Sequence, residues 1–201
     1  MIVYLGLPRC ASTWIYSHLN TEELKESHYL YTSPRDPISY IKNKQFEFST
    51  NNWSMDSNVA RAIDPYVDTY ILTVRNPIDL AVSYKNCFNV DQPLEQFIKT
   101  LIINKLLCYG DIIERWYTLV DPAKILICNY DDILADNQKF IIDLANKLET
   151  QVPATVNFNK INVSVDKVYE PLNSDVLDTL KFQIEKFEKI TNLTLNYAIN
   201  N

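Results

Sequence analysis

Glycine is nearly missing from this sequence: Gly6 and Gly110 are the only two glycines among 201 residues. No Gly-Lys-Ser or Gly-Lys-Thr tripeptide therefore exists. The Walker A motif needs such a tripeptide to supply its phosphate-binding lysine and its magnesium-binding hydroxyl. The sequence thus excludes an ordinary Walker A loop, and any phosphate site must be built from other residues.

Paired thiols, histidine clusters and long apolar runs are missing as well. The four cysteines (Cys10, Cys87, Cys108 and Cys128) show no Cys-x-x-Cys spacing, so we expect reduced thiols. Only two histidines occur, and no cluster of His and Cys has metal-ligand spacing, so we expect no metal. No run of about eighteen apolar residues predicts a membrane span. An apolar strand directly after Met1 leaves no room for a signal peptide, and we expect a cytoplasmic protein.

Basic charge is also in short supply. The net charge is −6, whereas broad nucleic-acid binding needs a basic face. The same charge argues against a polyanionic polysaccharide as partner, although a local basic pocket could hold a small anion. The length and the 47% apolar content fit one globular domain over residues 1–201.

What the sequence does have is a clear strand-loop-helix unit at its start. Residues 2–5 form a short apolar run of strand length, and Gly6 and Pro8 end it. A polar loop with Arg9 follows, and helical spacing begins at Ser12. A basic, hydroxyl-bearing loop at a helix N-terminus offers free N–H groups and the positive end of the helix dipole, so we expect a phosphate to bind there.

The rest of the chain alternates strands with helices. We expect strands at 69–74 and 124–128, and a shorter one at 28–31. Helices are expected at 21–26, from Pro77, from Pro93 to Leu119 with a break near Gly110, at 136–148, and from a cap at Ser174. Residues 33–66, rich in turn formers and aromatics, are expected to form binding surface. The alternation predicts a mainly parallel sheet with helices on both faces, whose ligands bind at the carboxyl ends of the strands.

Three stretches resemble the sulfotransferases that use 3′-phosphoadenosine 5′-phosphosulfate (PAPS). The family reads Pro-Lys-x-Gly-Thr-Thr-Trp where this chain has residues 8–14, Pro-Arg-Cys-Ala-Ser-Thr-Trp. Residues 75–83 look like its Arg-Asn-Pro-x-Asp-x-x-x-Ser motif, and Tyr130-Asp-Asp-Ile-Leu is similar to its Tyr-Glu-Asp-Leu. The resemblance implies a three-layer α/β/α, P-loop NTPase-like sulfotransferase fold.

The resemblance also implies roles for individual residues. The 5′-phosphosulfate would be held by the opening loop, the 3′-phosphate by Arg75 and Ser83, and Tyr130 would join the cofactor site. The residues of the opening loop are Pro8, Arg9, Cys10, Ala11, Ser12, Thr13 and Trp14. Arg9 keeps the charge of the family's lysine. Ala11 replaces a glycine, and its methyl would crowd the phosphate.

Several residues have a structural interpretation beside the functional one. Ser12 and Thr13 could cap the helix, and Trp14 could be a core residue instead of a partner for adenine. Asp79 is expected to brace its loop through hydrogen bonds. Asp131 or Asp132 is most simply a helix N-cap.

The acid–base group is expected after the first helix. Lys25-Glu26-Ser27-His28-Tyr29 resembles a family setting in which the glutamate takes the acceptor's proton. We therefore expect Glu26 to be the general base, with His28 as second choice, and Arg9 and Lys25 to offset charge on the transferring group. The alternative to a catalytic role is structural: Lys25 and Glu26 would be the solvated end of a helix, and His28 a buried strand residue.

The last third departs most from the family pattern. The glycine-rich late loop is missing, and Lys160 is a candidate to replace it at the 3′-phosphate. The acceptor, a small molecule or a carbohydrate or lipid group with a hydroxyl or amine, cannot be read from the sequence, and neither can the oligomeric state. Two other functions stay open: an ATP-dependent small-molecule kinase, and a degenerate member that binds nucleotide or partners without turnover.

Overall fold

The computed structural model describes residues 1–19, 30, 32, 35–42, 44–152, 156, 169–195 and 197. Its centre is a four-stranded parallel sheet in the order β2-β1-β3-β4. The strands are β1 (Ile2–Tyr4), β2 (Phe46–Phe48), β3 (Thr69–Val74) and β4 (Ile125–Asn129). The expected α/β class with a mainly parallel sheet is confirmed.

Side chains on both faces of the sheet are buried. Ile2 and Tyr4 of β1 and Ile71 of β3 belong to one core cluster, while Val3 and Tyr70, which point to the opposite face, are fully buried. Strands buried on both faces read as continuous apolar runs, as the Tyr-Ile-Leu stretch of β3 does.

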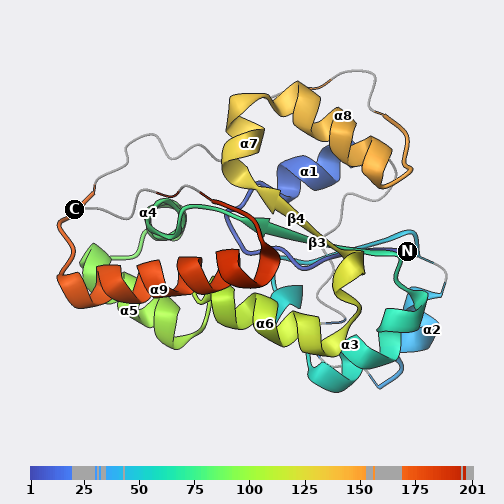
Figure 1. The fold of residues 1–201 in the computed structure, drawn as a ribbon, viewed down its shortest axis with the longest axis horizontal. Helices are drawn as coiled ribbons and strands as arrows, with labels where there is room; N and C mark the ends of the chain where they lie inside the picture. The colour runs from blue at the N-terminus through green and yellow to red at the C-terminus, as the bar shows by residue number, and fades with distance from the viewer. Residues whose placement is uncertain are drawn as a thin grey trace. The chain divides into compact units, whose positions relative to one another are not determined.

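One face of the sheet is covered by α1 (Ser12–Leu19), α7 (Tyr130–Ala135) and α8 (Asn137–Lys147), as Figure 1 shows. The apolar sides of these helices join the sheet in a single cluster. It includes Trp14, Ile15, Tyr16, Leu19, Ile133, Ile141, Leu144 and Leu148. This packing fixes the direction of α1, whose N-terminus follows the loop after β1.

By its internal packing the chain divides into two compact units, 1–74 with 119–161, and 75–118 with 162–201. The first unit contains the sheet together with α2 (Pro37–Ile41) and α3 (Ser57–Ile63). Short 3₁₀ turns occupy Asn52–Ser54, Asp64–Tyr66 and Pro122–Lys124. The expectation of a single domain stays a prediction.

The second unit is helical, with α4 (Pro77–Cys87), α5 (Leu94–Ile103), α6 (Tyr109–Leu119, of which the last residue belongs to the first unit) and α9 (Ser174–Thr191). Lys186 of α9 binds Asp111 and Glu114 of α6 at 2.8 and 2.7 Å. Gly110 lies so close to Lys186 that a Cβ there would meet its side chain at 2.7 Å. The scarce glycine therefore permits the close approach of α6 and α9. No helix in the described part of the chain is long and apolar enough to cross a membrane.

Several expectations about the elements need correction. The expected break near Gly110 lies earlier, at 104–108, where Lys105 takes the left-handed φ of 65°, and Gly110 is inside α6. Asn173, not Ser174, caps α9, because its side chain accepts the Val176 N–H. Region 33–66 contains α2, β2 and α3 as well as turns. The expected helix at 21–26 lies outside the described residues, and so does the strand expected at 28–31 except for Leu30, which is in a turn.

Candidate functional site

The carboxyl ends of three neighbouring strands meet at one edge of the sheet. The Leu5 N–H donates to the Ile71 carbonyl at 2.8 Å, and Val74 is in register with Asn129. The segments after β1, β3 and β4 therefore all begin at this edge. Open parallel sheets bind their ligands here, and the three sequence motifs start at these strand ends.

The loop after β1 has an unusual backbone. Arg9 and Ala11 both adopt left-handed conformations, with φ of 68° and 59°. Residues other than glycine are sterically strained in this conformation, and residues strained in this way are often found in ligand-binding loops. Ala11 takes the left-handed turn at the position where the related motif has glycine. The loop therefore makes this bend without glycine's conformational freedom.

The loop leads directly into the N-terminus of α1. The Ile15 N–H donates to the Ala11 carbonyl at 2.9 Å, which makes Ala11 the residue at which the helix opens. The first turn carries no acidic residue. The N–H groups before Ile15 have no partner one turn back in the helix, and no carboxylate of the first turn itself offsets the positive end of the dipole. This is an anion-binding geometry.

The Tyr4 side chain of β1 packs beside Gly6, at the start of the segment that leads into the loop. Its hydroxyl lies 2.5 Å from the Thr73 hydroxyl of β3. Burial raises the pKa of Tyr4 well above its usual value, Cys10 raises it further, and hydrogen bonds with Thr73 and Ser12 oppose the rise. A Cβ at Gly6 would overlap the Tyr4 ring, so this glycine is required by the tyrosine. Sequence reasoning missed Tyr4, because nothing in its local pattern distinguishes it from other strand residues.

Trp14 is a core residue in this structure. Its side chain is 2% exposed, and its ring packs beside His18 at 4.6 Å and Phe140 at 6.4 Å between centroids. The packing supports the interpretation of Trp14 as core over contact with adenine. Ser12 is buried and Thr13 is exposed at the start of the same helix.

The second motif begins where β3 ends and belongs to the helical unit. Arg75 is 5% exposed, and its carbonyl accepts the Tyr109 hydroxyl at 2.7 Å. Asn76 caps α4 by accepting the N–H groups of Ile78 and Asp79 at 3.0 and 3.3 Å, and Pro77 occupies the first helical position. These contacts fix the backbone around Arg75.

Ser83 and Asp79 lie further along α4. Ser83 is 1% exposed, on the buried side of the helix. Asp79 accepts a hydrogen bond from the Tyr169 hydroxyl, which agrees with its expected bracing role. The roles of Arg75 and Ser83 toward a 3′-phosphate stay predictions.

Tyr130 opens α7 and is half-buried against the core cluster. The cap of this helix is Asn129, whose side chain accepts the Asp131 N–H at 3.1 Å, so the expected cap at Asp131 or Asp132 is wrong. Tyr130 thus stands at the sheet edge where the other motifs begin.

The expected catalytic residues Glu26, Lys25 and His28 lie outside the described residues, as does Lys160. Within the described part, no group of three or more His, Cys, Asp or Glu side chains has the arrangement of a metal site.

No protein-family model and no curated protein matches this sequence. Among solved structures, a sulfotransferase from Alicyclobacillus acidocaldarius matches with a TM-score of 0.68 at 12% identity, over 96% of each chain. Mouse sulfotransferase SULT7A1 complexed with PAP matches with a TM-score of 0.50 at 14% identity, over 94% of this chain and 65% of the mouse chain.

The chain has the sulfotransferase fold. The fold suggested by the three motifs is therefore confirmed at a sequence identity too low to show it by itself. In this sulfotransferase fold residues 8–11 form the loop at the carboxyl edge of the sheet and residues 12–14 begin α1. The Tyr4 ring, which is hydrogen-bonded to Thr73, lies against Gly6 just before this loop.

Proposed function

We propose that this protein is a sulfotransferase that takes a sulfuryl group from PAPS and transfers it to a hydroxyl or amine. The observation that carries the proposal is the loop at residues 8–11. Two non-glycine residues in left-handed conformations turn it into a helix start without acidic residues, at the carboxyl edge of a sulfotransferase fold. The complex of the mouse structure with PAP supports the choice of cofactor.

The residues of the loop fit an anionic phosphosulfate. Backbone N–H groups at the start of α1 would donate to it, together with the Thr13 hydroxyl, and the Arg9 guanidinium would offset its charge. PAPS, when bound, supplies an activated sulfuryl group with a phosphate leaving group. Cations and N–H donors fixed before the reaction stabilise charge that grows on that phosphate.

The other roles follow from the motifs. Arg75 and Ser83 would select the 3′-phosphate, with Tyr130 and Lys160 as further contacts. Glu26 would take the proton from the acceptor, with His28 as second choice, and Lys25 would offset charge on the transferring group. The acceptor would be a small molecule or a carbohydrate or lipid group.

The cofactor assignment is tested by thermal denaturation with 3′-phosphoadenosine 5′-phosphate (PAP, the desulfated form of PAPS), with 5′-ADP, and with ATP and Mg²⁺. A ligand at a hundred times its Kd adds about 2.7 kcal/mol of stability, so binding is readily measured. We expect stabilisation by PAP, little by 5′-ADP, and a loss of the PAP effect in Arg9→Met and Arg75→Met. Arg61→Met, at an exposed position of α3, is the matched control. Preference for ATP with Mg²⁺ would indicate a kinase, and no stabilisation by any ligand would refute nucleotide binding.

The base is tested by Glu26→Gln. The substitution keeps size and hydrogen bonding but removes the group that takes the proton, so we expect turnover to fall roughly 10²- to 10⁴-fold. PAP should bind as tightly as in the parent protein. Unchanged turnover in this variant would eliminate Glu26 as base and direct attention to His28.

A further inference from the structure

Among the described residues, the outer edge of β4 has no neighbouring strand. β4 is an end strand, and no described segment pairs with its outer side. Its sequence, Ile-Leu-Ile-Cys-Asn, contains no proline and no charge, and all of its residues except Cys128 are only partly buried. Apolar edges of this kind are templates for another strand.

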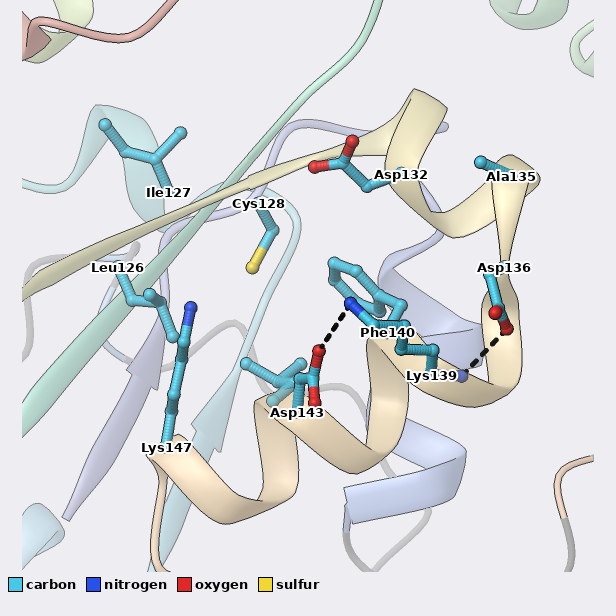
Figure 2. Close-up of a pocket in the computed structure, with 11 residues that line it drawn as sticks. Leu126, Ile127, Cys128, Asp132, Ala135, Asp136, Lys139, Phe140, Asp143 and Lys147 are labelled. Atoms are coloured by element: carbon cyan, nitrogen blue, oxygen red, sulfur yellow. Dashed lines mark hydrogen bonds and ion pairs between the residues drawn. The ribbon is translucent and has the colours of Figure 1, made fainter.

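A groove of about 330 Å³ runs beside this edge. Its floor includes Leu126 and Cys128 of β4, and its wall is one side of α8. In Figure 2 the labelled α8 side chains follow the strand at helical spacing, with Phe140 among the charged residues. Leu144 of the same helix also lines the groove. The groove therefore combines open backbone, apolar floor and ordered charge.

The charges of the groove are arranged by sign along the strand. Lys147 lies beside Leu126 near the start of β4, whereas Asp132 and Asp136 lie beyond its carboxyl end (Figure 2). Between them Lys139 pairs with Asp143 at 3.3 Å. The side chains of Lys147 and Asp132 form no ion pair with any other described residue. One end of the groove is thus basic and the other is acidic.

We infer that this groove binds a second copy of the same chain, with the two β4 strands side by side and antiparallel. A two-fold axis near Ile127 then brings the basic end of each groove to the acidic end of the other. Lys147 of one copy faces Asp132 and Asp136 of its mate. The two sheets join into one, which satisfies the open edge of both.

The inference is tested by the mass of the full-length protein in solution over a wide range of concentration. We expect a dimer in reversible equilibrium. Lys147→Asp opposes acidic groups at both symmetry-related contacts, and we expect it to weaken the dimer about tenfold. Asp132→Lys should do the same, and the double variant should restore the affinity. Lys181→Asp on α9 changes the net charge equally at an exposed site and should have no effect.

Hydrogen exchange locates the interface independently. Those amides of Leu126–Cys128 that point away from β3 should become more protected as the concentration rises, whereas those of β2, at the other end of the strand order, should not change. A protein that is monomeric throughout overturns the inference. So does a dimer that is insensitive to both charge reversals, or one that leaves the β4 amides unprotected.

Discussion

Ala11 holds a backbone conformation that glycine adopts without cost. At a φ of 59° its Cβ crowds the neighbouring carbonyl, which costs roughly 1–2 kcal/mol. Glycine would remove this strain but would gain about 0.5–1 kcal/mol of freedom in the unfolded chain. We expect Ala11→Gly to raise the free energy of unfolding by about 0.5 kcal/mol in urea denaturation, and to leave PAP binding intact or stronger.

The matched control is Ala60→Gly. Ala60 is buried in α3 with right-handed helical neighbours, so the same substitution there should lower the free energy of unfolding by about 1 kcal/mol or more. If Ala11→Gly were as destabilising as Ala60→Gly, the left-handed turn would not be the conformation of the loop.

Tyr4 marks the limit of what the sequence can show about single residues. Its partner Thr73 is 69 positions away, and the two meet only because β1 and β3 are neighbours in the sheet. Arg9, Ser12 and Thr13 could be singled out because their roles are local: a loop residue and the start of a helix. The tyrosine that supports them depends on pairing between strands, which local pattern does not encode.

At the scale of elements, β3 and α4 were predicted at their observed positions, β3 as a continuous apolar run and α4 from Pro77 at its start. β2 was missed because three residues among turn formers have no readable period. Its pairing with β1 makes it a strand, since Tyr4 lies opposite Phe48 and their rings are 4.9 Å apart.

The ion pair between α6 and α9 predicts a defined pH dependence. Burial alone would raise the pKa of Asp111, but hydrogen bonds from Lys186 and Gln183 have the larger combined effect, so its pKa lies below the usual value. The pKa of Lys186 is raised by its hydrogen bonds to Asp111 and Glu114. The carboxylate thus stabilises the fold above its unfolded pKa of about 3.9, and this stability is lost as the pH falls through the lower folded value. The protonated Lys186 stabilises the fold fully below its unfolded pKa of about 10.4. This contribution to stability is lost as the pH rises through the higher pKa of Lys186 in the folded protein.

Lys186→Met tests this dependence. We expect the variant to be less stable near neutral pH by about 0.5 kcal/mol, because partly exposed pairs contribute little. The difference from the parent protein should shrink at both extremes of pH in thermal denaturation. Lys189→Met, in the last turn of the same helix, is the control. A difference that stays constant with pH would mean that Lys186 acts through packing on Gly110 rather than through charge.

At the scale of the whole molecule, the fold followed from the sequence because three motifs in order require three parallel strands that end at one edge. The arrangement of the chain into two packed units did not follow, because it depends on contacts between distant helices such as α5 and α9. The four cysteines are distributed over both units: Cys10 and Cys128 lie in the first unit, and Cys87 and Cys108 lie in the second.

These thiols give a test of packing in the intact protein. Cys87 is exposed, whereas the other three are buried, and burial raises the pKa of Cys128 to about 12 and that of Cys108 above its usual value. Only thiolates react, and a thiol whose pKa is raised by burial stays protonated near pH 8, so Cys128 should react slowly in the native protein. We expect iodoacetamide to modify one cysteine in the native protein and four in denaturant, as counted by mass spectrometry. Cys87→Ser should abolish the rapid native reaction.

Rapid modification of Cys10 instead would show that the loop between β1 and α1 opens in solution, and would contradict the rigid anion site on which PAPS binding is proposed.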